Sequence, residues 1–171
     1  MTVVCVDSPI LIYALSRRNS SIDERLVRDA ADFLAWLDSQ GAEVLVPSIV
    51  IGEVLCGVTR DDEREEFHSL TNEFMTAPYD VPAALKFSRL FGRGASSKQA
   101  EVKAIRDSGV AATSRDGLKA DLMIIATALA HNASILYTHD EEMIRLANGL
   151  IDARDFVKED FPRRLPFPHD E

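Results

Sequence analysis

Four acidic residues stand in apolar surroundings, where an unpartnered carboxylate would be costly. Asp7 directly follows the apolar run VVCV, and Glu53 is the single acid in the stretch IVIGEVLCGV. Asp121 precedes the apolar segment LMIIATALA, and Asp140 follows SILYTH. Burying a lone carboxylate costs several kcal/mol unless it is paired, hydrogen-bonded or bound to a cation. These acids therefore need partners, and one shared site would supply them.

Carboxylates and water molecules are the ligands that hard cations such as Mg²⁺ and Mn²⁺ prefer. The sequence offers no matching set of His and Cys for zinc, because Cys5 lies in a predicted buried strand and Cys56 in a predicted helix, as reduced core thiols. His139 stands beside Asp140, and we expect it at the surface or next to a ligand rather than as a ligand itself. The residue types predict a Mg²⁺ or Mn²⁺ site.

Helix capping is an alternative for two of these acids. Asp121 and Asp140 could each cap the helix that follows, since Asp is common at helix starts. Capping does not explain Glu53 within an apolar helix, and capping alone explains Asp7 poorly. Ser8 could itself cap the helix that follows Asp7, with Pro9 at the first helical position.

The elements that would position these acids alternate between strand and helix. Strands are predicted at 2–6, 43–47, 74–76 and 134–137, with a weak one near 150–153. Helices are predicted from residue 8 and over 22–40, 48–58, 61–72, 82–91, 121–131 and 140–147. This alternation is typical of α/β proteins with a mainly parallel sheet of about four to five strands and helices on both faces. Ligands in such folds bind at the carboxyl ends of the strands, where Asp7 and Asp140 would lie.

Length and composition limit the remaining possibilities. The chain has 171 residues, 46% of them hydrophobic and 27% charged, as in a folded protein with one core. We expect a cytoplasmic protein, because we find neither a long apolar run nor a signal peptide. The formal net charge of −9 argues against nonspecific coating of nucleic acid. It does not exclude a nuclease, because bound cations reverse the local field.

Three segments in order resemble the PIN-domain ribonucleases, in particular the VapC-type toxins of toxin-antitoxin pairs. They are VVCVDSPILIYAL, VPSIVIGEVLCGV and GLKADLMIIATALAHNASILYTHDEEM. The resemblance matches Asp7, Glu53, Asp121 and Asp140 to the acidic quartet of that family. Ser8 matches the hydroxyl residue after the first acid, and Thr138 the one two positions before the last.

The resemblance implies a three-layer α/β/α domain over residues 1–155, followed by a C-terminal tail over 156–171. It implies hydrolysis of single-stranded RNA with one or two Mg²⁺ or Mn²⁺ ions held by the quartet. Ser8 and Thr138 would hydrogen-bond the quartet carboxylates. A homodimer and a cognate antitoxin are further expectations from the family.

The sequence departs from the family pattern at three places. Pro9 stands where the family often has Asn or Ser, and the segment 92–117 is longer than in compact toxins. The sequence YTHDEE also lets Glu141 or Glu142 share the role of Asp140. The long segment is locally basic, and the residues predicted to contact RNA there and just after it are Lys98, Lys103, Arg106 and Lys119.

Two other classes of function compete with a nuclease. A PIN-like module could bind RNA or protein without cutting, although such a scaffold has no reason to keep all four acids. Another Mg²⁺-dependent α/β protein, such as a haloacid-dehalogenase-like phosphatase or a receiver domain, is disfavoured. The phosphatase needs a second acid at the position of Pro9, and the receiver domain needs an acidic pair near the end of the first strand.

Overall fold

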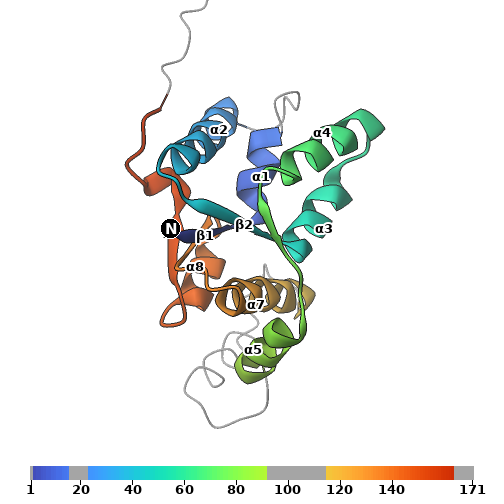
Figure 1. Cartoon of the computed structure of the whole chain (residues 1–171), viewed down its shortest axis with the longest axis vertical. Helices are drawn as coiled ribbons and strands as arrows, with labels where there is room; N and C mark the ends of the chain where they lie inside the picture. The colour runs from blue at the N-terminus through green and yellow to red at the C-terminus, as the bar shows by residue number, and fades with distance from the viewer. Residues whose placement is uncertain (1, 16–22, 92–114, 164–171) are drawn as a thin grey trace, which may run out of the picture.

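The computed structural model describes residues 2–15, 23–91 and 115–163. A five-stranded sheet runs through the centre of the molecule in the order β3-β2-β1-β4-β5, and every neighbouring pair is parallel (Figure 1). The strands are β1 (Val3–Val6), β2 (Glu43–Pro47), β3 (Met75–Ala77), β4 (Ile135–Thr138) and β5 (Asp152–Asp155). The strands predicted from the sequence are thus all present.

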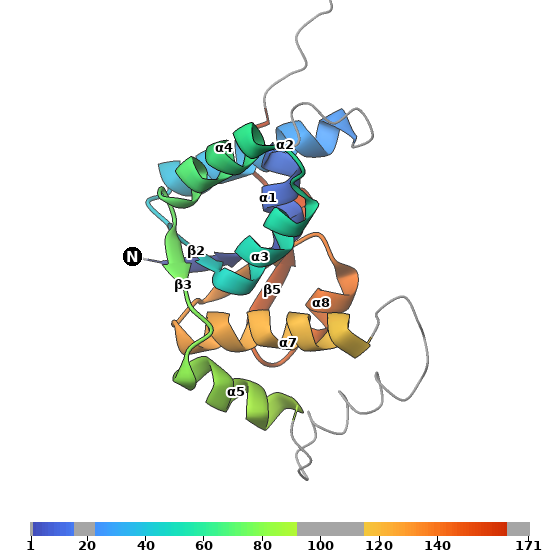
Figure 2. The ribbon, with the colours of Figure 1, turned by 90° about the vertical axis from the view of Figure 1, so that its right-hand side faces the viewer.

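Helices cover both faces of this sheet. They are α1 (Ser8–Leu15), α2 (Glu24–Ser39), α3 (Ser48–Gly57), α4 (Asp61–Thr71), α5 (Val81–Phe91), α7 (Arg115–Ala130) and α8 (Glu141–Ala147). Figure 2 shows α1, α2 and α4 on one side of the sheet and α7 on the other, with α5 packed against the outer side of α7. The predicted three-layer α/β/α architecture is confirmed.

Strand β1 occupies the middle of the sheet because its residues tolerate burial on both faces. Val4, Cys5 and Val6 are fully buried, and β-branched side chains suit such a strand. Val4 is in register with Val44 on β2 and with Ile135 on β4. The carboxyl ends of β1 and β4 therefore lie side by side, which brings Asp7 next to the residues that follow β4.

Helix α7 differs from the sequence prediction at its start. The helix begins at Arg115, whereas the sequence predicted that it begins six residues later, at Asp121. The first turns carry the polar sequence RDGLKA, which lacks the apolar periodicity that indicates a helix. Asp121 therefore lies inside the helix, and the capping alternative for this residue is wrong.

Two smaller expectations were also wrong. Cys56 is exposed on α3 rather than buried in the core, whereas Cys5 is buried as predicted. Ser8 does not cap α1 but is its first residue, and the side chain of the preceding Asp7 accepts its backbone N–H.

The core continues past residue 155, where the sequence suggested that a tail begins. Phe156, which starts a short 3-10 helix (Phe156–Lys158), is fully buried, and Phe161 is nearly so. Phe161 packs against Phe33 and Trp36 of α2, with ring centroids 5.3 and 6.2 Å away. Arg163 lies over the Phe161 ring at 4.0 Å and contacts the buried Asp29 at 3.4 Å. Residues 156–163 are thus part of the packed structure.

Among the helices in the described ranges, none is both long enough and apolar enough to cross a membrane.

Candidate functional site

Asp7 lies at the carboxyl end of β1 with only 2% of its surface exposed. Its backbone N–H donates to the carbonyl of Tyr137 at 3.0 Å, which ties it to β4. Its Oδ1 atom accepts the N–H of Ser8 at 2.7 Å and lies 3.5 Å from the Ser8 hydroxyl. Its Oδ2 atom accepts the hydroxyl of Thr138 at 2.6 Å. Residues from two adjacent strand ends therefore fix the orientation of this buried carboxylate.

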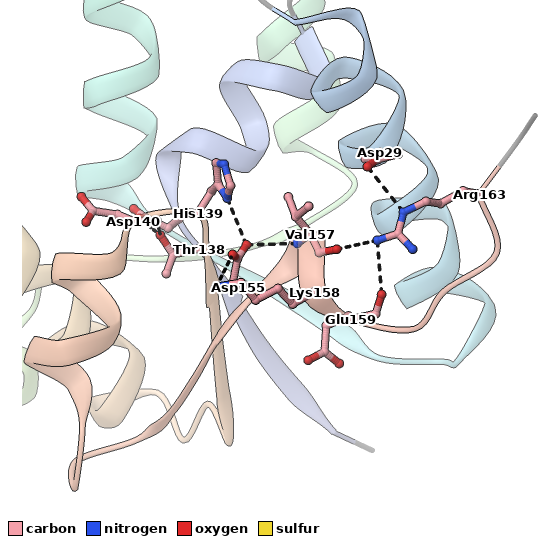
Figure 3. A network of polar contacts seen from close by, with 10 residues as sticks. Asp29, Thr138, His139, Asp140, Asp155, Val157, Lys158, Glu159 and Arg163 are labelled. Atoms are coloured by element: carbon pink, nitrogen blue, oxygen red, sulfur yellow. Dashed lines mark hydrogen bonds and ion pairs between the residues drawn. The ribbon is translucent and has the colours of Figure 1, made fainter. Parts of the chain in front are cut away.

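Thr138 links Asp7 to Asp140. Its hydroxyl donates to Asp7. The same oxygen accepts the backbone N–H of Asp140 at 3.0 Å (Figure 3). Asp140 itself caps α8, since its Oδ1 atom accepts the N–H groups of Glu142 and Met143 at 2.7 and 3.2 Å. The capping alternative for Asp140 thus holds for one oxygen, while its Oδ2 atom accepts no hydrogen bond from the described residues.

Asp121 and Glu53 approach this region from two helices. Asp121 projects from the second turn of α7 and is partly buried. Glu53 lies on α3, also partly buried, and forms no hydrogen bond or ion pair with any residue in the described ranges. Asp121 likewise forms no hydrogen bond or ion pair through its carboxylate with the residues that the structure describes, so neither acid has there the partner that a purely structural role would supply.

The pKa values of two of these acids show that the carboxylates influence one another. Burial, followed by repulsion from Asp7, Asp140, Glu53 and Glu142, raises the pKa of Asp121 to about 7. Burial also raises the pKa of Asp7 to about 6, with repulsion from Glu53 and Asp140 adding to it. The hydrogen bonds from Thr138 and Ser8 act against this rise, because they favour the ionised carboxylate. All four predicted acids thus belong to one electrostatic environment.

The donor chemistry of this region fits a hard divalent cation. Carboxylate oxygens are the ligands that Mg²⁺ and Mn²⁺ prefer, and a cation would offset the repulsion that raises both pKa values. As the side chains stand, no three His, Cys, Asp or Glu residues of the described chain are close enough together to hold a metal ion. Direct coordination by three or more of them would require these side chains to draw closer, whereas water molecules could bridge the present separations.

One residue pair beside the site was not found from the sequence. The Nδ1 atom of His139 lies 3.0 Å from the Oδ1 atom of Asp155, at the end of β5. Asp155 is in register with Thr138 on β4, so the parallel pairing places it next to the predicted site. Its position at the carboxyl end of a strand could have identified it, as the strand ends identified Asp7 and Asp140.

The residues predicted to contact RNA are only partly placed. Lys98, Lys103 and Arg106 lie outside the described residues. Lys119 lies on α7, two positions before Asp121, and is partly buried.

Comparison with known proteins agrees with this fold. The family model of the PIN domain matches residues 4–149. Similar solved structures include VapBC2 from Rickettsia felis bound to a promoter DNA fragment, at 15% identity and a TM-score of 0.59, covering 90% of this chain and 98% of that one. VapBC-1 from nontypeable Haemophilus influenzae is 16% identical with a TM-score of 0.60, covering 92% of this chain and 100% of that one.

A toxin-antitoxin complex from Klebsiella pneumoniae is 18% identical with a TM-score of 0.58, covering 90% of this chain and 97% of that one. No curated protein matches the sequence closely enough to count as a relative. The solved structures show a common fold at these identities, and the family model spans most of the sequence. The chain belongs to the PIN domain family.

Proposed function

We propose that this protein is a metal-dependent endoribonuclease that hydrolyses phosphodiester bonds of single-stranded RNA. The observation that carries the proposal is the mutual repulsion among Asp7, Glu53, Asp121 and Asp140 in a PIN domain. Perturbed carboxyl groups at the carboxyl ends of parallel strands are typical of functional sites in α/β folds. A scaffold without catalytic function would gain nothing from this repulsion.

The four carboxylates would hold Mg²⁺ or Mn²⁺, directly or through water. When bound, such a cation activates a water molecule for attack on phosphorus and stabilises negative charge on the phosphate and the leaving oxygen. Glu53 would bind the cation or orient the attacking water, because it has no other partner in the described chain. Glu142 also contributes to the field at Asp121, so it remains a candidate to share the role of Asp140.

The residues around Asp7 keep it ready for this role. Thr138 and the Ser8 N–H each donate to one oxygen of Asp7, which stabilises the ionised form and fixes its orientation. Each carboxylate oxygen has two lone pairs, so both can still accept a further partner. The hydrogen bonds therefore orient Asp7 without blocking it.

We further propose that the protein is the toxin of a toxin-antitoxin pair, acts as a homodimer and works in the cytoplasm. The support for an antitoxin is that the similar solved structures are VapBC and toxin-antitoxin complexes. An adjacent reading frame whose small product co-purifies with this chain and suppresses cleavage would support this part. Full activity in a stable complex with that product would contradict it.

The test of the nuclease is cleavage of end-labelled single-stranded RNA in millimolar Mg²⁺ or Mn²⁺ and in EDTA. We expect cleavage only with the cation, and its loss in Asp7→Asn and Asp121→Asn. Asp61→Asn is a matched control, because Asp61 is fully exposed at the start of α4, and should leave cleavage unchanged. Equal cleavage in EDTA would refute the mechanism. RNA binding with no cleavage under any condition would favour the non-catalytic module.

A further inference from the structure

We propose that His139, held in place by Asp155, contacts the 2′-hydroxyl of an RNA nucleotide next to the carboxylate site and so helps to select RNA over DNA. This inference rests on the proposed ribonuclease function, because it names a residue that would recognise the substrate of that site. The supporting observation is that one ring nitrogen of His139 is hydrogen-bonded to Asp155, while the other forms no hydrogen bond with the described residues.

The hydrogen bond to Asp155 decides which His139 nitrogen remains available. Nδ1 lies 3.0 Å from the Asp155 carboxylate, and an ionised carboxylate only accepts, so Nδ1 carries the hydrogen. The Nε2 atom forms no hydrogen bond within the described chain. Figure 3 shows this nitrogen on the side of the ring away from Asp155. A ligand outside the protein could therefore reach Nε2.

Asp155 is itself held in place. Its side chain is 9% exposed, and it accepts the N–H of Val157 at 3.1 Å and lies 3.2 Å from Nζ of Lys158. Burial raises the pKa of Asp155, but the hydrogen bonds from His139, Val157 and Lys158 outweigh it and keep the pKa below its ordinary value. Asp155 thus stays ionised and continues to orient His139.

Two aromatic rings support the imidazole from other directions. Tyr13 of α1 and the buried Phe156 meet it edge-on, with ring centroids 6.0 and 5.8 Å away. The side chain of His139 is nevertheless 32% exposed. A rigid ring with one open polar edge loses little conformational freedom when it binds a ligand, which favours recognition.

The position of His139 indicates which part of a substrate it would meet. It stands between Thr138 and Asp140, and Figure 3 shows its ring and the Asp140 carboxylate pointing in different directions from the end of β4. His139 therefore borders the carboxylate site without joining it. His139 would therefore contact a nucleotide next to the bond that is cut, rather than the bond itself.

The chemistry of the surroundings favours a hydroxyl as the group recognised. The Asp155 carboxylate, 3.0 Å from the other ring nitrogen, would repel a phosphate bound to His139, whereas a neutral hydroxyl carries no such penalty. A 2′-hydroxyl both donates and accepts, so it can pair with Nε2 whether or not this nitrogen carries a hydrogen. It is also the group by which a protein distinguishes RNA from DNA.

The test measures binding of a short fluorescent single-stranded RNA by anisotropy in EDTA and low salt. A set of oligonucleotides carries one 2′-deoxy substitution each, and an all-DNA version completes the set. For wild type we expect one position where the substitution weakens binding roughly three- to tenfold, the range for one neutral hydrogen bond. His139→Ala should bind that oligonucleotide and the parent RNA equally well.

Two further variants separate contact from simple folding defects. His139→Gln keeps a side chain that can donate and accept, so it should recover part of the discrimination, and Asp155→Asn should weaken it. His131→Ala is the matched control, because His131 follows the opposite end of α7 and lies 3.2 Å from the Pro78 carbonyl. It should discriminate as wild type does.

Three results would overturn the inference. The first is that no 2′-deoxy substitution weakens binding to wild type. The second is that His139→Ala still binds the 2′-deoxy oligonucleotide more weakly than the parent RNA, to the same extent as wild type. The third is that His139→Ala loses affinity for RNA and DNA equally, which would indicate a phosphate contact. Cleavage of the parent RNA with Mn²⁺, measured on the same samples, reports separately on the proposed nuclease. If the protein cleaves RNA but His139→Ala does not change the effect of any 2′-deoxy substitution on binding, this inference is refuted and the proposed nuclease is not.

Discussion

Replacing Asp121 with asparagine should make the metal-free protein more stable and remove most of the stabilisation that a divalent cation provides. Asp121 is partly buried inside α7, and its pKa is raised from an ordinary value of 3.8 to about 7. Burial is the largest cause, followed by the neighbouring carboxylates. Asparagine has nearly the same size but cannot ionise, so it removes both the charge and its repulsion.

The magnitude follows from the linkage between pKa and stability. Because the pKa is higher in the folded than in the unfolded state, folding disfavours the ionised form. The resulting penalty is absent below about pH 4, grows as the pH rises, and is complete above about pH 7. At about 1.4 kcal/mol per pKa unit it approaches about 4 kcal/mol, an upper bound for a partly exposed group. Burying a neutral amide offsets part of it, so we expect a net gain of about 1–2 kcal/mol at neutral pH.

The assay is thermal unfolding of wild type and Asp121→Asn in EDTA and in millimolar Mn²⁺. For a chain of this size, 1–2 kcal/mol corresponds to a rise in Tm of roughly 3–6 °C in EDTA. A cation at a hundredfold excess over its Kd should add about 2.7 kcal/mol to wild type, or roughly 5–11 °C. The variant should keep little of this second shift.

The exposed substitution Asp61→Asn provides the control, and it should behave as wild type in both solutions. An Asp121→Asn protein that is clearly less stable than wild type in EDTA would contradict this prediction, because the carboxylate would then have a structural partner. A wild type without a cation-dependent shift in Tm, or a variant that retains the whole shift, would contradict it as well.

Three other predictions concern the surroundings of the site. Thr138→Val removes the donor to Asp7 and the acceptor of the Asp140 N–H, so it should cost about 1–3 kcal/mol in urea unfolding, whereas Thr59→Val at an exposed position should not. In urea unfolding, metal-free wild type should become more stable as the pH falls from 7 to 5, because the raised pKa values let Asp7 and Asp121 take up protons. Asp7→Asn should gain less stability over this range, and an equal gain would contradict the raised pKa of Asp7. Phe161→Ala should lower the free energy of unfolding by about 3–5 kcal/mol, and a loss below 1 kcal/mol would show that residues past 155 are a dispensable tail.

The sheet and two of the acids could be predicted because their signals are local. The runs VVCV and EVLVP are short, apolar and rich in β-branched residues, which is typical of buried parallel strands. Asp7 directly follows β1 and Asp140 comes two residues after β4, and parallel pairing collects strand ends at one edge of the sheet. Local pattern and simple topology were therefore enough.

The features that were missed depend on contacts between distant segments. The polar first turns of α7 carry no apolar periodicity, and the helix packs against α5 and the sheet. The pairing of His139 with Asp155 follows from the register of β4 and β5, which the sequence does not encode locally. Phe161 is buried only because Phe33 and Trp36 of α2 receive it. Such contacts appear only once the chain is folded.

The central claim is that Asp7, Glu53, Asp121 and Asp140 together hold a catalytic cation. Anomalous diffraction from crystals grown with millimolar Mn²⁺ would test it most directly, because the signal locates the ion without assumptions about its ligands. We expect a peak between Asp7 and Asp121, within coordination distance of their carboxylate oxygens. A fully occupied peak elsewhere on the protein, or no peak among these carboxylates, would contradict it.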